Sequence, residues 1–192
     1  MDAGKNYILH KPFGYLSQFI SNGKIKKKHK FLGELYDFPD EAMAIGRLDL
    51  QSEGLLFVTT KGMTSHEVRS AKYEKEYWVQ VDGEITDEAL EQLQSGVEIT
   101  TQYGPYITKN CQAKKIQNPG FPERNGRKVR DDRHGPTTWI SIVLTEGKFR
   151  QVRKMTAAVN FPTLRLVRWR IGSITLENLK LGEVQEVARF TQ

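Results

Sequence analysis

The chain has 192 residues, of which 38 % are hydrophobic and 27 % charged, so we expect one soluble domain, or one domain made of two lobes. No apolar run is long enough to cross a bilayer and the N-terminal residues lack the apolar core of a signal peptide, so no membrane association is expected. The single cysteine, Cys111, excludes an internal disulfide and suits a reducing cytoplasm, where we expect the protein to act. The four histidines lack the spacing of zinc ligands, so we expect no metal site.

The net charge is +6, and the basic residues are concentrated in one segment. Between Gly147 and Arg170 there are seven basic residues and no acidic one, whereas the rest of the chain has 22 basic residues against 23 acidic ones. Such a cluster is typical of proteins that bind a polyanion. A solvated basic face is the other interpretation of the same charges.

The first part of the chain predicts strands separated by loops. Residues 6–20 predict a strand followed by a Pro-Phe-Gly turn. Residues 21–30 contain five lysines and predict an exposed, mobile basic loop. Asp49 then precedes the apolar run 54–60, which predicts a fully buried strand. The capping-box pattern Thr64-Ser-His-Glu67 predicts a short helix that continues to about Lys72.

The middle of the chain predicts a strand, a helix and a long insertion. Apolar and polar residues alternate over 73–83, as in a half-buried strand. A helix is expected over 87–95, capped by Thr86 and stopped by Gly96. Its buried stripe consists of Ala89, Leu90 and Leu93. Residues 118–136 are rich in glycine, proline and arginine and predict a second mobile basic loop.

The last third is the most regular. Residues 139–144 predict a strand, and Val152, Met155 and Val159 mark one face of a helix that must end before Pro162. Residues 165–171 alternate again, with Leu166, Arg168 and Arg170 on one face. Strands interspersed with short helices predict an α+β fold around a sizeable sheet.

Asp49 is a candidate catalytic residue. It has no histidine relay, no serine nucleophile and no neighbouring acid arranged for two metal ions, and the stretch after it lacks the glycine spacing of a phosphate loop. A lone carboxylate can act as nucleophile or base if a nearby cation keeps it ionised, and Arg47 is two residues away. The alternative is that Asp49 only caps its own turn.

Four stretches, in order, resemble the pseudouridine synthases, in particular the branch that modifies ribosomal RNA and is typified by the small-subunit synthase A. They are HKPFGYLSQF, GRLDLQSEGLLFVTTKG, KEYWVQVDG and TEGKFRQVRKMTAAVNFPTLRLVRWRIG. The resemblance implies the catalytic fold of that family, a two-lobed, mixed or largely antiparallel sheet flanked by short helices and basic loops. The sequence departs from the family where TTKG replaces the frequent TNDG and where Phe149 replaces a residue that is commonly polar.

Within this branch, residues 136–179 look most like the type E enzymes, which modify large-subunit RNA. Many relatives carry an S4 RNA-binding domain, whereas this chain starts directly at the catalytic motifs, so we expect residues 1–192 to form one catalytic domain. The resemblance implies a specific uridine in ribosomal RNA as substrate, most simply in the large-subunit RNA, free or in an assembling subunit. It implies no cofactor and no metal, and we expect a monomer.

The resemblance also implies roles for ten residues. Asp49 matches the catalytic carboxylate, Arg153 its basic partner, and Tyr77 the tyrosine that lies against the target base. Arg47 matches a residue that fills the space left by the displaced base. The remaining residues expected to contact RNA are Lys148, Arg150, Gln151, Lys154, Arg168 and Arg170. The alternative for Arg153 is a helix-surface arginine that binds phosphate. The alternative for Tyr77 is an ordinary core aromatic on an alternating strand, which periodicity alone favours.

A non-catalytic factor that binds ribosomal RNA or assists ribosome assembly is the competing interpretation. It explains the basic cluster and the two basic loops equally well. It gives no reason for Asp49, Tyr77 and Arg153 to occupy three matching motif positions at once. The sequence therefore favours the enzyme.

Overall fold

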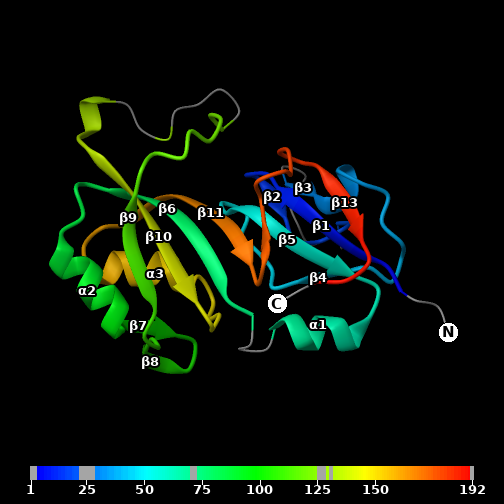
Figure 1. Cartoon of the computed structure of the whole chain (residues 1–192), viewed down its shortest axis with the longest axis horizontal. Coiled ribbons are helices and arrows are strands. Elements are labelled where there is room, and N and C mark those ends of the chain that lie inside the picture. The colour runs from blue at the N-terminus through cyan, green and yellow to red at the C-terminus, as the bar shows by residue number, and fades with distance from the viewer. Residues whose placement is uncertain (1–3, 22–28, 70–72, 125–128, 130–131, 191–192) are drawn as a thin grey trace. The chain divides into compact units, whose positions relative to one another are not determined.

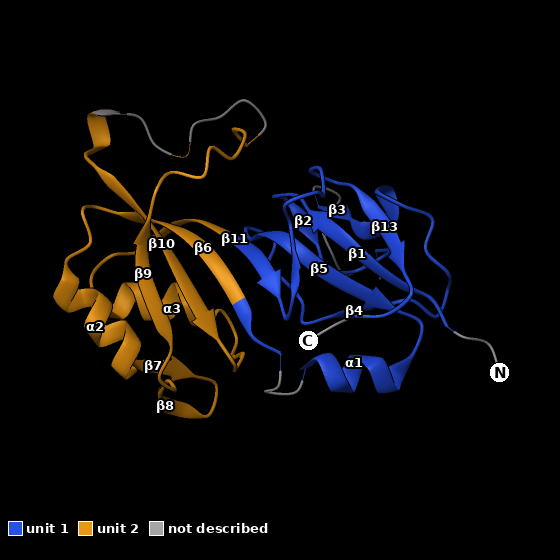
Figure 2. Cartoon of the chain, viewed as in Figure 1, with its two compact units in different colours: residues 1–75, 167–192 blue, residues 76–166 orange. Residues whose placement is uncertain are grey.

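The computed structural model describes residues 4–21, 29–69, 73–124, 129 and 132–190. In this described part the chain is α+β, with three α-helices and a large, mostly antiparallel sheet, which confirms the expected fold class. The chain divides into two compact units (Figure 2). The first unit comprises residues 1–75 and 167–192, and the second comprises residues 76–166.

The first unit is built on strands from both ends of the chain (Figure 1). Its elements are β1 (Asn6–Lys11), β2 (Tyr15–Leu16), β3 (Lys30–Phe31), the 3-10 helix η1 (Leu32–Glu34), β4 (Met43–Ile45), β5 (Glu53–Thr59), α1 (Gly62–Arg69), β12 (Ile174–Thr175) and β13 (Val184–Val187). Strand β1 pairs antiparallel with β13 and with β5. The other edge of β5 pairs with β4 and with the end of β11 (Thr163–Ile171), which enters from the second unit.

Strand β5 is the central strand of the first unit and is buried over its whole length. Its apolar residues run without alternation because neighbouring elements cover both of its faces. On one face Leu56 and Val58 pack with Tyr7 and Leu9 of β1. On the other face Phe57 stacks on Phe190, with ring centres 4.2 Å apart. This burial rigidly anchors the loop that precedes β5.

The predicted start of the first helix was wrong. Helix α1 begins at Gly62, so Thr64 lies inside the helix and not at its cap. The carbonyl oxygen of Lys61 accepts the first helical N–H, that of Ser65, at 3.2 Å. The backbone leaving β5 therefore sets the helix start, and it overrides the local Thr-Glu pattern. The predicted continuation over residues 70–72 lies outside the described residues.

The second unit carries the other two helices. Its elements are β6 (Lys75–Asp82), α2 (Asp87–Ser95), β7 (Glu98–Thr101), β8 (Gly104–Ile107), β9 (Gln112–Ile116), the 3-10 helix η2 (Asp132–His134), β10 (Thr137–Leu144) and α3 (Gln151–Ala158). Within this unit the strand order is β6-β10-β9, and β7 and β8 form a separate hairpin.

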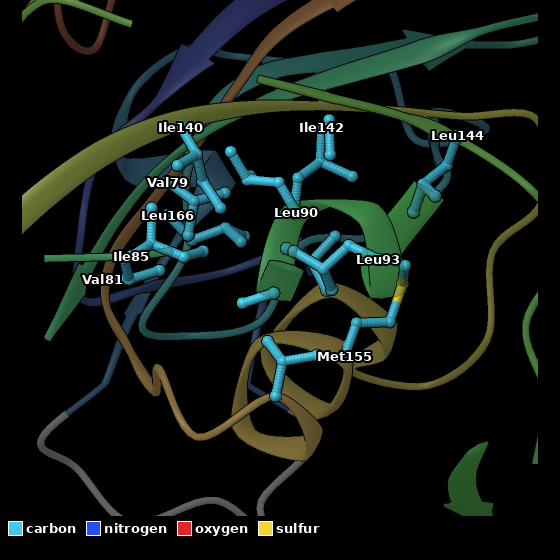
Figure 3. Packing of buried hydrophobic residues seen from close by; sticks show 14 of the residues in the cluster. Val79, Val81, Ile85, Leu90, Leu93, Ile140, Ile142, Leu144, Met155 and Leu166 are labelled. Carbon is cyan, nitrogen blue, oxygen red and sulfur yellow. The ribbon is translucent and has the colours of Figure 1, made fainter. Parts of the chain in front are cut away.

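The prediction for α2 is confirmed. Thr86 Oγ accepts the N–H of Ala89 at 3.2 Å, as an N-cap should, and the helix ends at Gly96. The predicted stripe of Ala89, Leu90 and Leu93 is buried. Figure 3 shows Leu90 and Leu93 of α2, with Met155 of α3, in one cluster with residues of β10, including Ile140 and Ile142. Each such aliphatic side chain stabilises the unit by about 1.5–3 kcal/mol through burial.

Strand β11 departs from the expected two-sided pattern. Residues 165–168 are all buried, although two of them, Arg165 and Arg168, are basic. Arg165 is covered because Phe121 lies against its guanidinium, 5.4 Å from the ring centre, and because Nη1 donates to the carbonyl oxygen of Pro122 at 3.0 Å. Hydrogen bonding and ring contacts thus let basic residues enter the interior.

The two predicted basic loops are only partly described. For the loop 21–30, residues 22–28 lie outside the described residues. For 118–136, residues 125–128 and 130–131 lie outside them. At the beginning of this second loop, Phe121 packs against Trp78 and Trp139, with ring centres 5.8 Å apart in each pair.

Candidate active site

Asp49 lies half-buried in the loop 46–52 between β4 and β5, here called the aspartate loop. Its carbonyl oxygen accepts the N–H of Ser52 at 3.0 Å, which closes a tight turn. The preceding residue, Leu48, is held from both sides by the buried Ser17. Ser17 Oγ accepts the N–H of Leu48 at 3.0 Å and donates to its carbonyl oxygen at 2.8 Å. The backbone beside Asp49 is therefore fixed by a second segment.

The segment that contains Ser17 is itself held by hydrogen bonds from a buried lysine side chain. Lys11, at the end of β1, is completely buried, and its Nζ donates to the carbonyl oxygens of Pro12 at 3.0 Å and Tyr15 at 2.7 Å. Gly14 in the same turn donates its N–H to the carbonyl oxygen of Leu50 at 2.9 Å. The turn and the aspartate loop thus hold each other. Sequence reasoning missed Lys11 and Ser17, because nothing local shows that distant backbone carbonyls will surround them.

Arg168 supports the same loop from inside the first unit. Its side chain is only 3 % exposed, and Nε donates to the carbonyl oxygen of Leu55 at 2.7 Å. Its Nη1 passes Gly46, at the start of the aspartate loop, 3.7 Å from where a Cβ would lie. Arg168 was expected to contact RNA phosphate. In this position it supports the packing of β11 against β5 and does not present its charge at the surface.

The other two predicted arginines of the first unit are accessible. Arg47 is exposed, two residues before Asp49. Arg170 is partly exposed: Nη2 lies 3.1 Å from Glu74 Oε2, and Nη1 donates to the carbonyl oxygen of Gly172 at 2.7 Å. Both side chains can reach a ligand from the first unit.

Tyr77 and Arg153 both belong to the second unit. Tyr77 lies on β6, half-buried against the core cluster that contains Val79 and Val81. Arg153 lies in the first turn of α3 and is half-exposed. Tyr77 therefore packs against the core without being fully buried.

A carboxylate that sequence reasoning did not single out organises the turn before α3. Glu146 accepts hydrogen bonds from Tyr106 Oη at 2.6 Å, Gln151 Nε2 at 2.7 Å and the N–H of Lys109 at 2.9 Å. Gln151 Oε1 in turn accepts the N–H of Lys148 at 2.8 Å. We call these contacts the Glu146 network. Gln151, which was expected to contact RNA, is buried within this network and helps to hold the turn.

The Glu146 network affects the protonation of its members. Burial alone would raise the pKa of Glu146, but the hydrogen bonds from Tyr106, Lys109 and Gln151, with the charge of Lys148, lower it below its ordinary value. The hydrogen bond to Glu146 raises the pKa of Tyr106. The carboxylate is thus ionised and fully engaged at neutral pH.

The predicted cations of the second unit surround the same turn. Lys148 is exposed, and its Nζ lies 4.5 Å from the ring centre of Tyr106. Lys154 Nζ donates to the carbonyl oxygen of Thr100 at 2.7 Å and lies 5.4 Å from the ring centre of Phe149. Arg150 is the N-cap residue of α3. These three basic residues therefore lie in the turn before α3 or in α3 itself.

The ten predicted residues divide between the units. The first unit holds Arg47, Asp49, Arg168 and Arg170, and the second holds Tyr77, Lys148, Arg150, Gln151, Arg153 and Lys154. Among the described residues, no group of three or more histidine, cysteine, aspartate or glutamate side chains is arranged to hold a metal ion. None of the described helices is long and apolar enough to traverse a bilayer.

An α+β protein with a braced loop aspartate and a basic turn has the features of an enzyme that acts on nucleic acid. Residues 5–158 match the family of RNA pseudouridylate synthases. The chain belongs to this family, which confirms the resemblance, and it is an RNA pseudouridine synthase.

Particular relatives are similar over nearly the whole chain. The ribosomal large subunit pseudouridine synthase E of Vibrio vulnificus is 42 % identical over 96 % of this chain and 75 % of its own length. The enzyme of the same name from Xanthomonas campestris is 38 % identical over 92 % of this chain and 91 % of its own length. A crystal structure of a pseudouridylate synthase has the same fold, with a TM-score of 0.74 at 23 % identity over 96 % of this chain and 70 % of that one.

Proposed function

We propose that this protein isomerises a uridine of large-subunit ribosomal RNA to pseudouridine, with Asp49 as the catalytic carboxylate. The target is supported by the names of the relatives at 38 % and 42 % identity, which are large-subunit enzymes. The role of Asp49 is supported by the hydrogen bonds that hold its loop from Ser17 and Gly14. A cytoplasmic location and a monomeric state are part of the same proposal.

The reaction rearranges bonds within one nucleotide. The bond between ribose C1′ and uracil N1 breaks, the uracil turns, and C5 bonds to C1′. The hydrogen on C5 leaves as a proton and N1 takes up a proton, so no electrons are gained or lost. Asp49 can take part by adding to the sugar, by adding to the ring or by removing the proton from C2′. The proposal covers all three routes.

Arg153 and Tyr77, both in the second unit, are assigned the roles that the family's motifs give to their positions. Arg153 is the basic partner of the catalytic carboxylate. Tyr77 is the tyrosine that lies against the target base. Arg47, exposed beside the aspartate loop, fills the space that the base vacates. Removing the base from its stack costs a few kcal/mol, which these contacts offset.

The decisive test is tritium release from large-subunit ribosomal RNA labelled at uracil C5. The native protein should release tritium, because C5 loses its hydrogen only when the new carbon–carbon bond forms. Asp49→Asn should bind the RNA normally and release at least about 1,000-fold less, because it lacks the reacting carboxylate. Asp40→Asn is the matched control, since Asp40 is an exposed aspartate of the same unit and should release tritium normally.

The outcomes separate the parts of the proposal. Release by Asp49→Asn at the native rate would remove Asp49 from the chemistry. Release from small-subunit RNA alone would correct the substrate. No release from either RNA, naked or in assembling subunits, would favour a factor that only binds RNA.

A further inference from the structure

Phe149 is a solvent-exposed aromatic residue. Its side chain is 74 % exposed, in the turn between β10 and α3. The next residue, Arg150, adopts the left-handed conformation with φ of 53°. This conformation is unfavourable for residues other than glycine, asparagine and aspartate. Contacts around the turn therefore stabilise a backbone conformation that Arg150 does not itself favour.

Those contacts come from the neighbouring β7–β8 hairpin (Figure 1). The Glu146 network ties the turn to Tyr106 of β8. Lys154 ties α3 to the carbonyl oxygen of Thr100 in β7. The exposed ring thus belongs to a turn that is held by hydrogen bonds. It therefore loses little conformational entropy when a ligand binds it.

The charges around Phe149 are positive. Lys154 Nζ lies 5.4 Å from its ring centre, and Lys148 and Arg150 are its chain neighbours on either side. The nearest carboxylate in the turn, Glu146, is already bound by three donors. An exposed ring beside several cations suits a polyanion with flat rings better than an apolar protein surface.

We propose that Phe149 is a stacking platform for an unpaired base of the RNA substrate, with Lys148 and Lys154 binding the adjacent phosphates. This inference rests on the proposed function and adds a binding site for a base other than the reacting uridine. Aromatic rings stack on bases of any identity, and cations beside them follow the backbone. Phe149 offers no hydrogen bond, so the platform holds the strand and does not read its sequence.

The test compares three variants for binding to a single-stranded oligouridylate of about 12 nucleotides and to a blunt-ended, fully paired RNA duplex of similar length. Phe149→Leu keeps the apolar surface but removes the flat ring, and it should weaken single-strand binding roughly 5- to 100-fold. Binding to the paired duplex should be unchanged. Phe149→Trp should retain the native affinity. Tyr103→Leu, on the 91 % exposed aromatic of the β7–β8 turn, should also behave as native.

Activity distinguishes this inference from the proposed function. With tritium-labelled ribosomal RNA, Phe149→Leu should raise KM and leave kcat unchanged, because the platform binds the strand and does not touch the reacting atoms. Native single-strand affinity in Phe149→Leu would overturn the platform, and so would an equal loss in Tyr103→Leu, even if tritium release is normal. Phe149-dependent strand binding without any tritium release would sink the proposed function and leave the platform standing.

Discussion

Gly54 is the residue at which β5 and β11 approach most closely in the first unit. Its φ is +112°, and a Cβ would overlap the backbone nitrogen and oxygen of Arg168. We expect Gly54→Ala to lower the free energy of unfolding by about 3 kcal/mol or more, because backbone strain and steric overlap add. Urea denaturation of the native and variant proteins measures this difference.

Gly62→Ala is the control for that measurement. Gly62, in the same unit, is the first residue of α1, has no positive φ, and has no atom within 4 Å of where its Cβ would lie. We expect a change of less than about 1 kcal/mol. If Gly54→Ala were as stable as Gly62→Ala, the close approach of Arg168 to Gly54 would be contradicted.

Arg168 is buried, although the basic cluster to which it belongs predicts contact with phosphate. Its place among seven basic residues indicates phosphate binding. Its 3 % exposure and its hydrogen bond to Leu55 indicate a structural support beneath the aspartate loop. A one-dimensional charge pattern cannot separate these roles, because both require a cation at the same position.

At the scale of elements, the Glu146 network makes the turn before α3 sensitive to acid. A carboxyl group whose pKa is lowered by folding contributes stability above its unfolded pKa, near 4.3. That stability is lost as pH falls through the lower pKa of the folded state. We expect Glu146→Gln to cost about 1–2 kcal/mol at pH 7, after allowing for solvent screening, and progressively less as pH falls below about 4.

Thermal unfolding of both proteins between pH 7 and pH 3 tests this expectation. Glu91→Gln serves as the control, because Glu91 lies on the exposed face of α2, outside the network. Its difference from the native protein should stay near zero at every pH. A difference for Glu146→Gln that does not shrink in acid would mean that the ionised carboxylate is not what holds the turn.

Local signals predicted elements well where packing agreed with them. The cap at Thr86 and the apolar stripe of α2 required only residues within nine positions of each other, and both are confirmed. The capping box at Thr64 was equally good as a local pattern, yet the helix begins at Gly62. There the exit of the chain from the buried strand β5 sets the first hydrogen bond, and strand position is a long-range property.

At the scale of the whole molecule, binding of RNA should depend steeply on salt. Besides Arg153, the proposed partner of Asp49, five predicted cations remain at least partly exposed: Arg47, Lys148, Arg150, Lys154 and Arg170. If each meets a phosphate, the logarithm of the binding constant should fall with the logarithm of salt concentration with a slope of about −3.5 to −4.5. Filter binding of large-subunit ribosomal RNA across a salt series measures the slope.

Two lysine variants locate the charges responsible. Lys148→Ala should make the slope shallower by roughly 0.7 to 0.9, because one fewer counterion is released. Lys115→Ala should leave it unchanged, since Lys115 pairs with Asp87 at 2.7 Å and lies on β9, outside the basic turn. An affinity that does not change with salt would contradict ionic binding as a whole.

The sequence by itself determined the fold class, the family and the chemistry that Asp49 is proposed to perform. These depend on local periodicity and on short motifs, which one chain displays directly. Only the tertiary structure decided that Lys11, Ser17 and Arg168 brace the aspartate loop, that Glu146 organises the turn before α3, and that Phe149 stays exposed on that turn. Burial and hydrogen-bond partners arise between residues that are far apart in the sequence: Arg168 and Leu55 are separated by 113 positions. Such contacts form only when folding brings distant backbone carbonyls to a side chain, and no local pattern records them.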